Sequence, residues 1–292
     1  MKKAQINGYT LEHKIQGKSV YLASKGKQKY VLKLSASPSL KNEFFLLNEI
    51  QNECIIPVNE YFIRGELHCF SMPVAKGDDL LVLISTFVSH QRFIPEETVR
   101  SFMKQIFSAI SHIHKHGIIH RDISPENILF LDSEKKKIVL ADFGLACRDP
   151  TENKLTGTGP YQAPEIFERR PYNNKVDCWA AGIVMYMLLY RMYPFFKLDK
   201  DGNVSKDWYD EDKIKRADLK FDEDNIDISY QAMDLIKKLI CVDPDLRFSA
   251  AQALEHPWFK HTPNIIQETS QFISRIESEV NSANDIIAKE YS

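Results

Sequence analysis

The sequence lacks the features that mark secreted, membrane-spanning and disulfide-stapled proteins. Its five cysteines are odd in number, widely scattered and form no CxxC pair, which favours a reducing compartment over a disulfide scaffold or a zinc site. Lys2 and Lys3 precede no apolar run, so no secretory signal is expected. The most apolar stretch, Cys178 to Tyr190, is too short to cross a bilayer and predicts a buried helix. We therefore expect a protein of the cytoplasm or nucleus that does not bind membranes.

An excess of charge of one sign is also missing. The 38 Lys and Arg residues nearly balance the 40 Asp and Glu residues, for a net charge of −2, which argues against a nucleic-acid partner. The chain has no internal repeats or low-complexity segments, and its 43% hydrophobic and 27% charged content is that of an ordinary globular protein. Its 292 residues can bury one large core or two modest ones, and we expect a monomer.

Strand-like and helical patterns occupy different parts of the chain. Residues 9–72 hold short strand-like runs and one helical stretch, Ser39–Gln51. Helical patterns dominate from Leu80 to Phe259. A strand-rich small half followed by a helix-rich large half is an α+β pattern, and the cleft between two such halves is where ligands bind. The strand-like runs include Ser19–Ala23, Tyr30–Leu34 and Leu67–Met72, with two further pieces at Ile128–Leu131 and Ile138–Leu140.

The segment Lys197–Lys220 is polar and charged and predicts a surface loop. Its run Asp199–Asn203 invites comparison with the calcium loop of an EF-hand. The glycine of this run is fourth where that loop needs it sixth, and Asp210, not a glutamate, stands at the twelfth position. The pattern therefore does not predict a calcium site.

The last 32 residues, 261–292, show a different pattern. Apolar residues recur there at three-, four- and seven-residue steps, which predicts an amphipathic helix. The charges of this tail are mostly acidic, whereas calmodulin-binding helices are basic. We expect the tail to pack on the large half of the protein, with contact to a partner or to a longer missing segment as the alternative. Its apolar positions are Ile265, Phe272, Ile276, Val280, Ala283 and Ile287.

Two short motifs carry residues suited to phosphoryl transfer. Residues His120–Asn127 read HRDISPEN, and the triplet Asp142–Gly144 begins fifteen residues after the asparagine. The carboxylate of Asp122 can accept a proton from a hydroxyl group. Asn127 and Asp142 offer the hard oxygen ligands that Mg²⁺ prefers.

With these motifs the chain resembles a eukaryotic protein kinase of the serine/threonine type over about residues 9 to 260. The run Gly157–Glu165, GTGPYQAPE, looks like the substrate-docking loop and its closing APE, and Thr158 with Tyr161 matches serine/threonine kinases. Arg247 is the expected ion partner of the glutamate that ends this run. The ending His256–Phe259, HPWF, is typical of the calcium/calmodulin-dependent kinase group and of calcium-dependent protein kinases.

The resemblance implies an α+β, bilobal protein kinase fold. A small β-rich N-lobe with one main helix would span residues 9–73, and a large α-helical C-lobe would span residues 74–260. Residues 261–292 would form the C-terminal amphipathic helical tail.

The resemblance also implies a role for each motif residue. Asp122 would be the catalytic acid/base residue, and Asn127 and Asp142 would hold Mg²⁺. Lys33, in Tyr-Val-Leu-Lys, would grip the α- and β-phosphates of ATP and is counted with Asp122 and Asn127 as catalytic. Arg121 would brace the segment that leads to the substrate-docking loop.

The helix after Lys33 offers two glutamates as its partner, Glu43 and Glu49. In the family, an apolar residue follows this glutamate by four positions and stacks in a column that joins the lobes. Glu43 is followed in this way by Leu47, whereas Glu49 is followed by Glu53. We therefore expect Glu43 to pair with the lysine.

The resemblance to protein kinases also predicts which residues form the column and which surround the nucleotide. The column would contain Val58, Leu47, Phe143 and His120, anchored by Asp177. The adenine would lie under Val20 and Val31, beside the gatekeeper Met72 and the hinge Pro73–Ala75. Asp79 would meet the ribose or a basic substrate residue, and Glu126 would favour basic substrates. The full set expected to contact ATP or its Mg²⁺ is Ile15, Val20, Val31, Lys33, Glu43, Met72, Pro73, Val74, Ala75, Asp79, Glu126, Asn127, Leu129 and Asp142.

Two departures from the family pattern leave a second function open. His13, Ile15 and Lys18 stand where the glycines of the phosphate-covering loop belong, although glycine lets the backbone lie close to phosphates. Ser124 stands where a lysine usually touches the γ-phosphate. The chain is therefore either a kinase, weakened by these changes, that phosphorylates Ser or Thr of protein substrates, or a pseudokinase that acts as a nucleotide-binding or scaffolding module.

Overall fold

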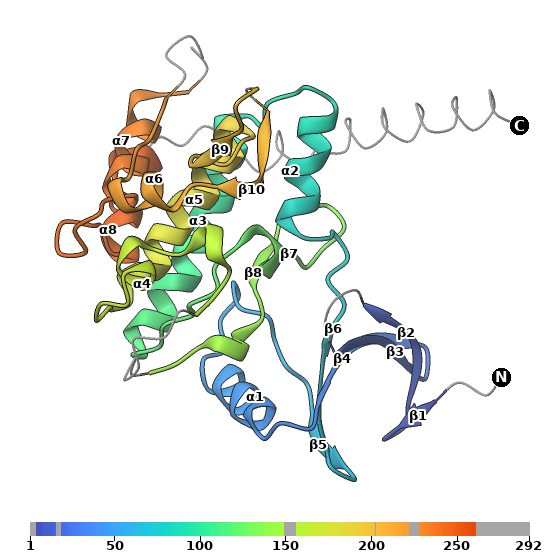
Figure 1. Cartoon of the computed structure of the whole chain (residues 1–292). Helices are drawn as coiled ribbons and strands as arrows, with labels where there is room; N and C mark the ends of the chain where they lie inside the picture. Colours follow the sequence, from blue (N-terminus) through green and yellow to red (C-terminus); the bar gives the residue numbers. More distant parts are fainter. Residues whose placement is uncertain (1–3, 16–18, 149–155, 202, 222–227, 261–292) are drawn as a thin grey trace, which may run out of the picture.

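The computed structural model describes residues 4–15, 19–148, 156–201, 203–221 and 228–260, so the predicted helical tail lies outside the described residues. A curved sheet with one helix beside it forms the first part of the chain, and a larger group of helices forms the second (Figure 1). The predicted α+β organisation is confirmed.

The sheet of the first part is antiparallel and six-stranded, in the order β1-β2-β3-β4-β6-β5. Gly26 lies in the β3–β4 hairpin turn with a φ of +64° and supplies the positive φ that this two-residue turn requires. The predicted strands Tyr30–Leu34 and Leu67–Met72 match β4 and β6. The strands are β1 (Gln5–Ile6), β2 (Tyr9–Ile15), β3 (Val20–Lys25), β4 (Gln28–Ser35), β5 (Tyr61–Arg64) and β6 (Leu67–Pro73).

The helix α1 (Ser39–Glu49) packs against the sheet beside β6. Its buried positions are Leu40, Glu43, Phe44 and Leu47, which fall at the three- and four-residue steps of one helical face. A carboxylate in that buried face needs a partner, because an unpaired charge in a protein interior is unstable. The helix ends two residues before the predicted Gln51, since Ile50 already has non-helical backbone angles.

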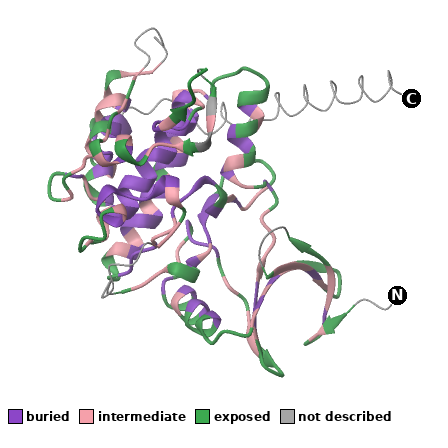
Figure 2. Cartoon of the chain, viewed as in Figure 1, coloured by how far each residue is buried: buried purple, intermediate pink, exposed green. Residues whose placement is uncertain are grey.

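The second part is mainly helical, and its buried residues concentrate in two long helices, α3 and α5 (Figure 2). Residues 176–190 of α5 are all buried, as expected of a helix that is apolar around its whole circumference. The helices are α2 (Leu80–Ser89), α3 (Glu96–Lys115), α4 (Pro164–Phe167), α5 (Lys175–Tyr190), α6 (Glu211–Arg216), α7 (Tyr230–Leu239) and α8 (Ala250–Leu254), with short 3₁₀ turns η1 (Pro125–Asn127), η2 (Phe143–Leu145), η3 (Gly159–Tyr161) and η4 (Pro257–Phe259).

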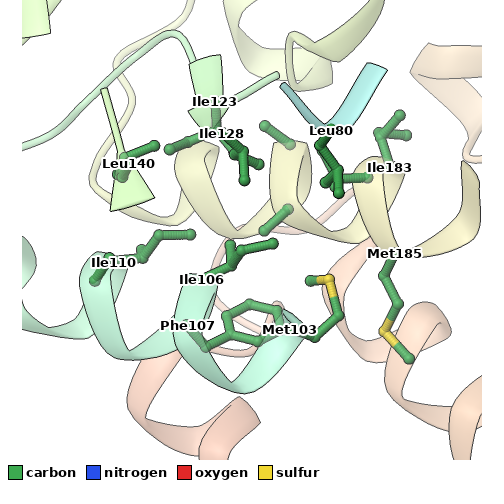
Figure 3. Packing of buried hydrophobic residues seen from close by; sticks show 14 of the residues in the cluster. Leu80, Met103, Ile106, Phe107, Ile110, Ile123, Ile128, Leu140, Ile183 and Met185 are labelled. Carbon is green, nitrogen blue, oxygen red and sulfur yellow. The ribbon is translucent and has the colours of Figure 1, made fainter. Parts of the chain in front are cut away.

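One apolar core joins these helices to the segments that carry the motifs. Met103, Ile106 and Phe107 of α3 belong to one buried cluster with Ile183 of α5 and with Ile123, which follows Asp122 in the HRDISPEN motif (Figure 3). The motif segments are therefore mounted on a packed support, in which side chains have little freedom to shift. In the described part of the chain, no helix has both the length and the apolar character needed to span a bilayer.

Two short strand pairs complete the second part. The pair β7 (Ile128–Phe130) and β8 (Ile138–Leu140) matches its predictions to within a residue. The pair β9 (Phe196–Leu198) and β10 (Val204–Tyr209), followed by α6, occupies the segment predicted to be a surface loop. The segment lies at the surface but is not an irregular loop (Figure 1). Its polar residues hid the hairpin, whose last two residues, Trp208 and Tyr209, make ring contacts with Tyr193 and Phe167.

A buried ion pair fastens the end of the GTGPYQAPE run to the C-terminal helices. Arg247 donates to both carboxylate oxygens of Glu165, from Nη1 at 2.6 Å and Nη2 at 2.9 Å, and both side chains are fully buried. Arg247 also donates from Nε to the carbonyl of Cys241 at 2.9 Å, so its donors are matched by several acceptors. The predicted pair is confirmed, and its two-pronged geometry suits guanidinium and carboxylate groups.

We predict that Arg247→Ala lowers the free energy of unfolding by about 3–5 kcal/mol, because it leaves the buried carboxylate of Glu165 unpaired. Arg170, whose pair with Glu168 has half-exposed side chains, is the matched control, and Arg170→Ala should cost less than about 1 kcal/mol. Urea unfolding of the two variants measures the difference. Equal losses in both would contradict this account of the pair.

Candidate active site

One lysine ammonium links three separate segments of the chain. Lys33 on β4 donates from Nζ to both carboxylate oxygens of Glu43 on α1, at 2.7 and 2.8 Å, and to Oδ1 of Asp142 at 2.8 Å. Burial by itself lowers the pKa of Lys33, but the two carboxylates outweigh it and raise this pKa, so the side chain stays an ammonium. The choice of Glu43 is confirmed, since Glu49 instead pairs with Arg148 at 2.5 Å.

The backbone of the DFG triplet is shaped to bring its aspartate to this lysine. Asp142 has a φ of +62° in the left-handed region, which aspartate tolerates better than most residues and which is frequent at functional sites. A Cβ at Gly144 would lie 3.3 Å from Oδ1 of Asp142 and 3.5 Å from Nζ of Lys33. The glycine thus leaves room around the ion contact that a larger residue would crowd.

Asp122 is held in place by hydrogen bonds from two directions. Its Oδ2 accepts from Nδ2 of Asn127 at 2.8 Å, and its Oδ1 accepts from the backbone N–H and the hydroxyl of Thr158 at 3.0 and 2.8 Å. Nδ2 of Asn127 also donates to the carbonyl of Asp122 at 2.9 Å. The amide nitrogen therefore faces Asp122, and the amide oxygen is the atom of Asn127 suited to a cation.

The sequence did not predict the contact between Thr158 and Asp122. The sequence feature that could have indicated this contact is the pair of glycines that flank the threonine. Gly157 has a φ of +101°, and a Cβ at this position would lie 2.2 Å from the carbonyl oxygen of Arg121. Only glycine allows this approach, so the GTG sequence brings the docking loop directly against the HRD segment.

A buried carboxylate on α5 fixes the backbone of the HRD segment. Asp177 accepts the backbone N–H groups of His120 and Arg121, each at 2.9 Å, and Nε2 of His114 at 2.8 Å. Burial raises the pKa of Asp177, but the hydrogen bonds and the nearby histidines outweigh that effect and lower it. The anchoring role predicted for Asp177 is confirmed, whereas the bond to His114 was missed because it joins residues distant in sequence.

The predicted column of residues between the two parts is present at its centre. The rings of His120 and Phe143 meet edge to face with centroids 4.6 Å apart. Leu47 is buried in the same core, α1 contacts the η2 turn that holds Phe143, and Val58 packs partly buried against this core. The column therefore links the position of α1 to the position of the DFG triplet.

Arg121 contacts the chain that follows the DFG triplet. Its Nε donates to the carbonyl of Leu145 at 2.6 Å, and its Nη1 donates to the hydroxyl of Tyr172 at 3.1 Å. These bonds agree with the predicted bracing role as far as residue 148. The segment 149–155 lies outside the described residues.

The residues expected to surround a nucleotide base lie on the adjoining strands and the segment after them. Val31 on β4 pairs with Met72 on β6, and Leu129 on β7 forms a bridge with Asp79. Oδ1 of Asp79 accepts from the N–H of Val82 at 2.9 Å and caps α2. Their contacts with ATP stay predictions. The same holds for the other residues of the set: Val20 on β3, Ile15 at the end of β2, Pro73 at the end of β6, Val74 and Ala75 after it, and the exposed Glu126 in η1.

The two departures from the family pattern lie near this site. Ser124 is buried, next to the η1 turn that presents Asn127. His13 and Ile15 belong to β2, with Ile15 partly exposed, and Lys18 lies outside the described residues.

The oxygen donors fit magnesium better than a metal held by protein ligands alone. Among the described residues, no three His, Cys, Asp or Glu side chains gather to hold a metal ion. Mg²⁺ typically takes one or two protein oxygens and fills its other positions with phosphate oxygens and water. Asp142 and Asn127 are joined through the backbone, since the N–H of Ala141 donates to the carbonyl of Asn127 at 2.9 Å. They can supply this pair of oxygens from neighbouring positions.

Comparisons with known proteins point to one family. The sequence model of the protein kinase domain matches residues 9–259. The chain is 33% identical to a calcium/calmodulin-dependent protein kinase type 1 of Caenorhabditis briggsae over 75% of its length, and 31% identical to one of Macrobrachium nipponense over 81%. It is 34% identical over 85% of its length to a probable serine/threonine-protein kinase, fhkC, of Dictyostelium discoideum. These matches span 60%, 68% and 41% of the respective relatives.

The buried imidazole of His120 should make stability depend on pH. Nδ1 of His120 accepts from the N–H of Asp122 at 3.2 Å, and Nε2 lies 3.2 Å from the carbonyl of Ala141, which suits the neutral ring with its proton on Nε2. Burial lowers the pKa of His120. A histidine with a lowered folded-state pKa takes up its proton first in the unfolded chain, so its contribution to stability is lost as the pH falls below the unfolded value of about 6.5.

We predict that His120→Phe removes up to about 1.4 kcal/mol per pH unit from the slope of unfolding free energy against pH below about pH 6.5. Urea unfolding at several pH values from 7.5 to 5 measures both slopes. The variant keeps the share of the slope that comes from His112, whose pKa is also lowered by burial. Parallel curves for wild type and variant would show that His120 does not titrate in this way.

Proposed function

Because the chain belongs to the protein kinase family, we propose that it transfers the γ-phosphoryl group of Mg·ATP to serine or threonine hydroxyls of protein substrates. The observation that carries this proposal is the joint placement of Lys33, Glu43 and Asp142 in one ion contact, with Asp122 held next to Asn127. Phosphoryl transfer needs a cation on the phosphates, oxygens for a metal and a base aimed at the acceptor hydroxyl. These groups supply all three.

In this mechanism Lys33 binds the α- and β-phosphates of ATP, and Glu43 keeps its ammonium oriented. Asp142 and Asn127 would hold Mg²⁺, which would neutralise charge on the phosphate oxygens when bound. The adenine lies between the valines of β3 and β4 and Leu129, with the backbone after Met72 facing its edge. The phosphates and the acceptor are thus held in position before reaction, which is the main source of rate in this chemistry.

Asp122 acts on the acceptor. As the acceptor oxygen forms its bond to the γ-phosphorus, its proton passes to the carboxylate of Asp122, and the bond from the γ-phosphorus to the oxygen bridging it to the β-phosphate breaks to leave ADP. Thr158 and Asn127 fix the two oxygens of this carboxylate by the hydrogen bonds already described. Because Ser124 brings no positive charge to the γ-phosphate, we expect slower transfer than in a kinase with lysine there.

A non-catalytic binding module is the less favoured function. Such a module would have no need for an ammonium shared by two carboxylates, or for an aspartate bonded to both Asn127 and the docking-loop threonine. All five cysteines lie among the described residues and none of them forms a disulfide, which supports a cytoplasmic or nuclear setting for the proposed activity.

Regulation is a separate question. Two of the relatives are named as calcium/calmodulin-dependent. The acidic character of residues 261–292 argues against a calmodulin-binding helix in that stretch of this chain. We therefore propose that residues 261–292 do not place the phosphate transfer by this domain under calmodulin control.

We predict that Asp122→Asn lowers phosphate transfer from labelled ATP to a basic serine peptide by at least about 100-fold, because asparagine cannot take up the proton. Asp245→Asn, an exposed aspartate in the segment before α8, is the matched control and should leave the rate unchanged. Magnesium-dependent thermal stabilisation by ATP should persist in both variants. Wild-type transfer no faster than that of Asp122→Asn, with stabilisation by ATP intact, would replace the kinase with the binding module.

A further inference from the structure

One buried glutamine is bonded to the docking loop on both sides of Thr158. Nε2 of Gln162 donates to the carbonyls of Thr156 and Gly157, both at 3.0 Å, and its backbone N–H donates to the carbonyl of Gly159 at 3.1 Å. The residue is only 6% exposed. Because both side-chain partners are carbonyl oxygens, only the nitrogen end of the carboxamide can face them. A single residue therefore holds the loop immediately before and after the threonine that contacts the candidate base.

The peptide group between Gly157 and Thr158 connects this glutamine to Asp122. Its carbonyl accepts from Nε2 of Gln162, whereas its N–H donates to Oδ1 of Asp122 at 3.0 Å. The C=O and N–H of one peptide group lie in a plane and point to opposite sides, so this group is held at both ends. Hydrogen bonds that follow one another in this way also polarise one another. The bond from the glutamine thus strengthens the N–H as a donor to the carboxylate.

The orientation of this peptide group is not fixed by Gly157 itself. The residue has a φ of +101°, and a Cβ on it would lie 2.2 Å from the carbonyl oxygen of Arg121, so the position requires glycine. Glycine has no Cβ to restrict its backbone angles, and the peptide that follows it can turn over. A turned peptide would aim its carbonyl oxygen, instead of its N–H, at the carboxylate of Asp122. The bond from Gln162 selects the orientation in which the carboxylate receives the N–H.

On the basis of the proposed kinase function, we propose that Gln162 is a positioning residue for phosphoryl transfer. It fixes the peptide that donates to Oδ1 of Asp122, while Asn127 donates to Oδ2 of the same carboxylate. The carboxylate is thereby oriented from both sides before the acceptor hydroxyl arrives, which is how preorganised groups contribute to rate. Nε2 of Gln162 bonds backbone carbonyls of the loop, so it acts on the reaction through Asp122 and not on the nucleotide.

The test compares Gln162→Met, which keeps the side-chain length but removes the donor, with Gln105→Met. Gln105 on α3 is the matched control because its carboxamide also bonds two backbone groups. Its Nε2 donates to the carbonyl of Lys136 at 3.0 Å, and its Oε1 accepts from the N–H of Ile138 at 2.9 Å. Both variants should lower the melting temperature, but only Gln162→Met should lower kcat for the basic serine peptide, by about 10-fold. KM for ATP should stay within about 2-fold, because Lys33 still binds the phosphates.

Two further variants separate positioning from a merely structural role. Gln162→Glu places an acceptor against the loop carbonyls when it is ionised, but its protonated form donates one hydrogen bond. Its kcat relative to wild type should therefore rise as the pH falls from about 8 to about 6. In the Asp122→Asn background, Gln162→Met should slow transfer by less than about 2-fold, because a residue that acts through Asp122 has nothing left to position. A structural role would slow transfer equally in both backgrounds.

Hydrogen exchange of the Thr158 amide, followed by NMR, separates this inference from the kinase proposal. Gln162→Met should speed this exchange at least about 10-fold relative to wild type and to Gln105→Met. That result supports the hydrogen-bond link to Asp122 even if wild type transfers phosphate no faster than Asp122→Asn, in which case only the proposed function fails.

Three results would each overturn the inference. They are unchanged exchange at Thr158 in Gln162→Met, an equal loss of kcat from this change with and without Asp122→Asn, and, in an active wild type, the same kcat for Gln162→Met as for Gln105→Met. Thermal unfolding and circular dichroism of each variant confirm that the comparison is between folded proteins.

Discussion

The shared ammonium of Lys33 is the interaction on which the rest of the site depends. A single charge that is mostly removed from water binds one carboxylate from α1 and another from the DFG triplet. Paired charges in such surroundings are stable only with close, well-directed contacts, because each has given up hydration. The contact therefore sets where α1 lies relative to the sheet and where Asp142 lies relative to the HRD segment. A change at any of the three residues alters the other two.

The HRD segment is held by a separate device, the buried carboxylate of Asp177. It accepts the backbone N–H groups of the two residues that precede Asp122, and α5, which carries it, packs against α3. Asp122 then meets Asn127 on one side and Thr158 on the other. A base fixed in this way needs little rearrangement when an acceptor arrives, which is how preorganised sites gain rate.

The parts of the structure predicted from sequence are those set by local pattern or by motif. The positions of β4, α1 and β8 follow from side-chain periodicity, and the choice of Glu43 over Glu49 followed from the apolar residue one turn later. The contacts that were missed join distant residues by shape, such as the hydroxyl of Thr158 on Asp122 and the imidazole of His114 on Asp177. The β9–β10 hairpin was missed because its strands carry mixed polar residues, and its aromatic residues contact Tyr193 and Phe167, which lie outside the hairpin. Such contacts leave little trace in the local sequence.

Glu43 is expected to act on the nucleotide only through Lys33. The most direct measurement is a double-mutant cycle on the affinity for a magnesium-bound, non-hydrolysable ATP analogue, measured by calorimetry for wild type, Lys33→Met, Glu43→Gln and the double variant. The account predicts that Glu43→Gln weakens binding in wild type and changes it little once Lys33 is gone, giving a coupling free energy of at least about 1 kcal/mol. Additive effects, with a coupling below about 0.5 kcal/mol, would show that the ion contact does not govern nucleotide binding.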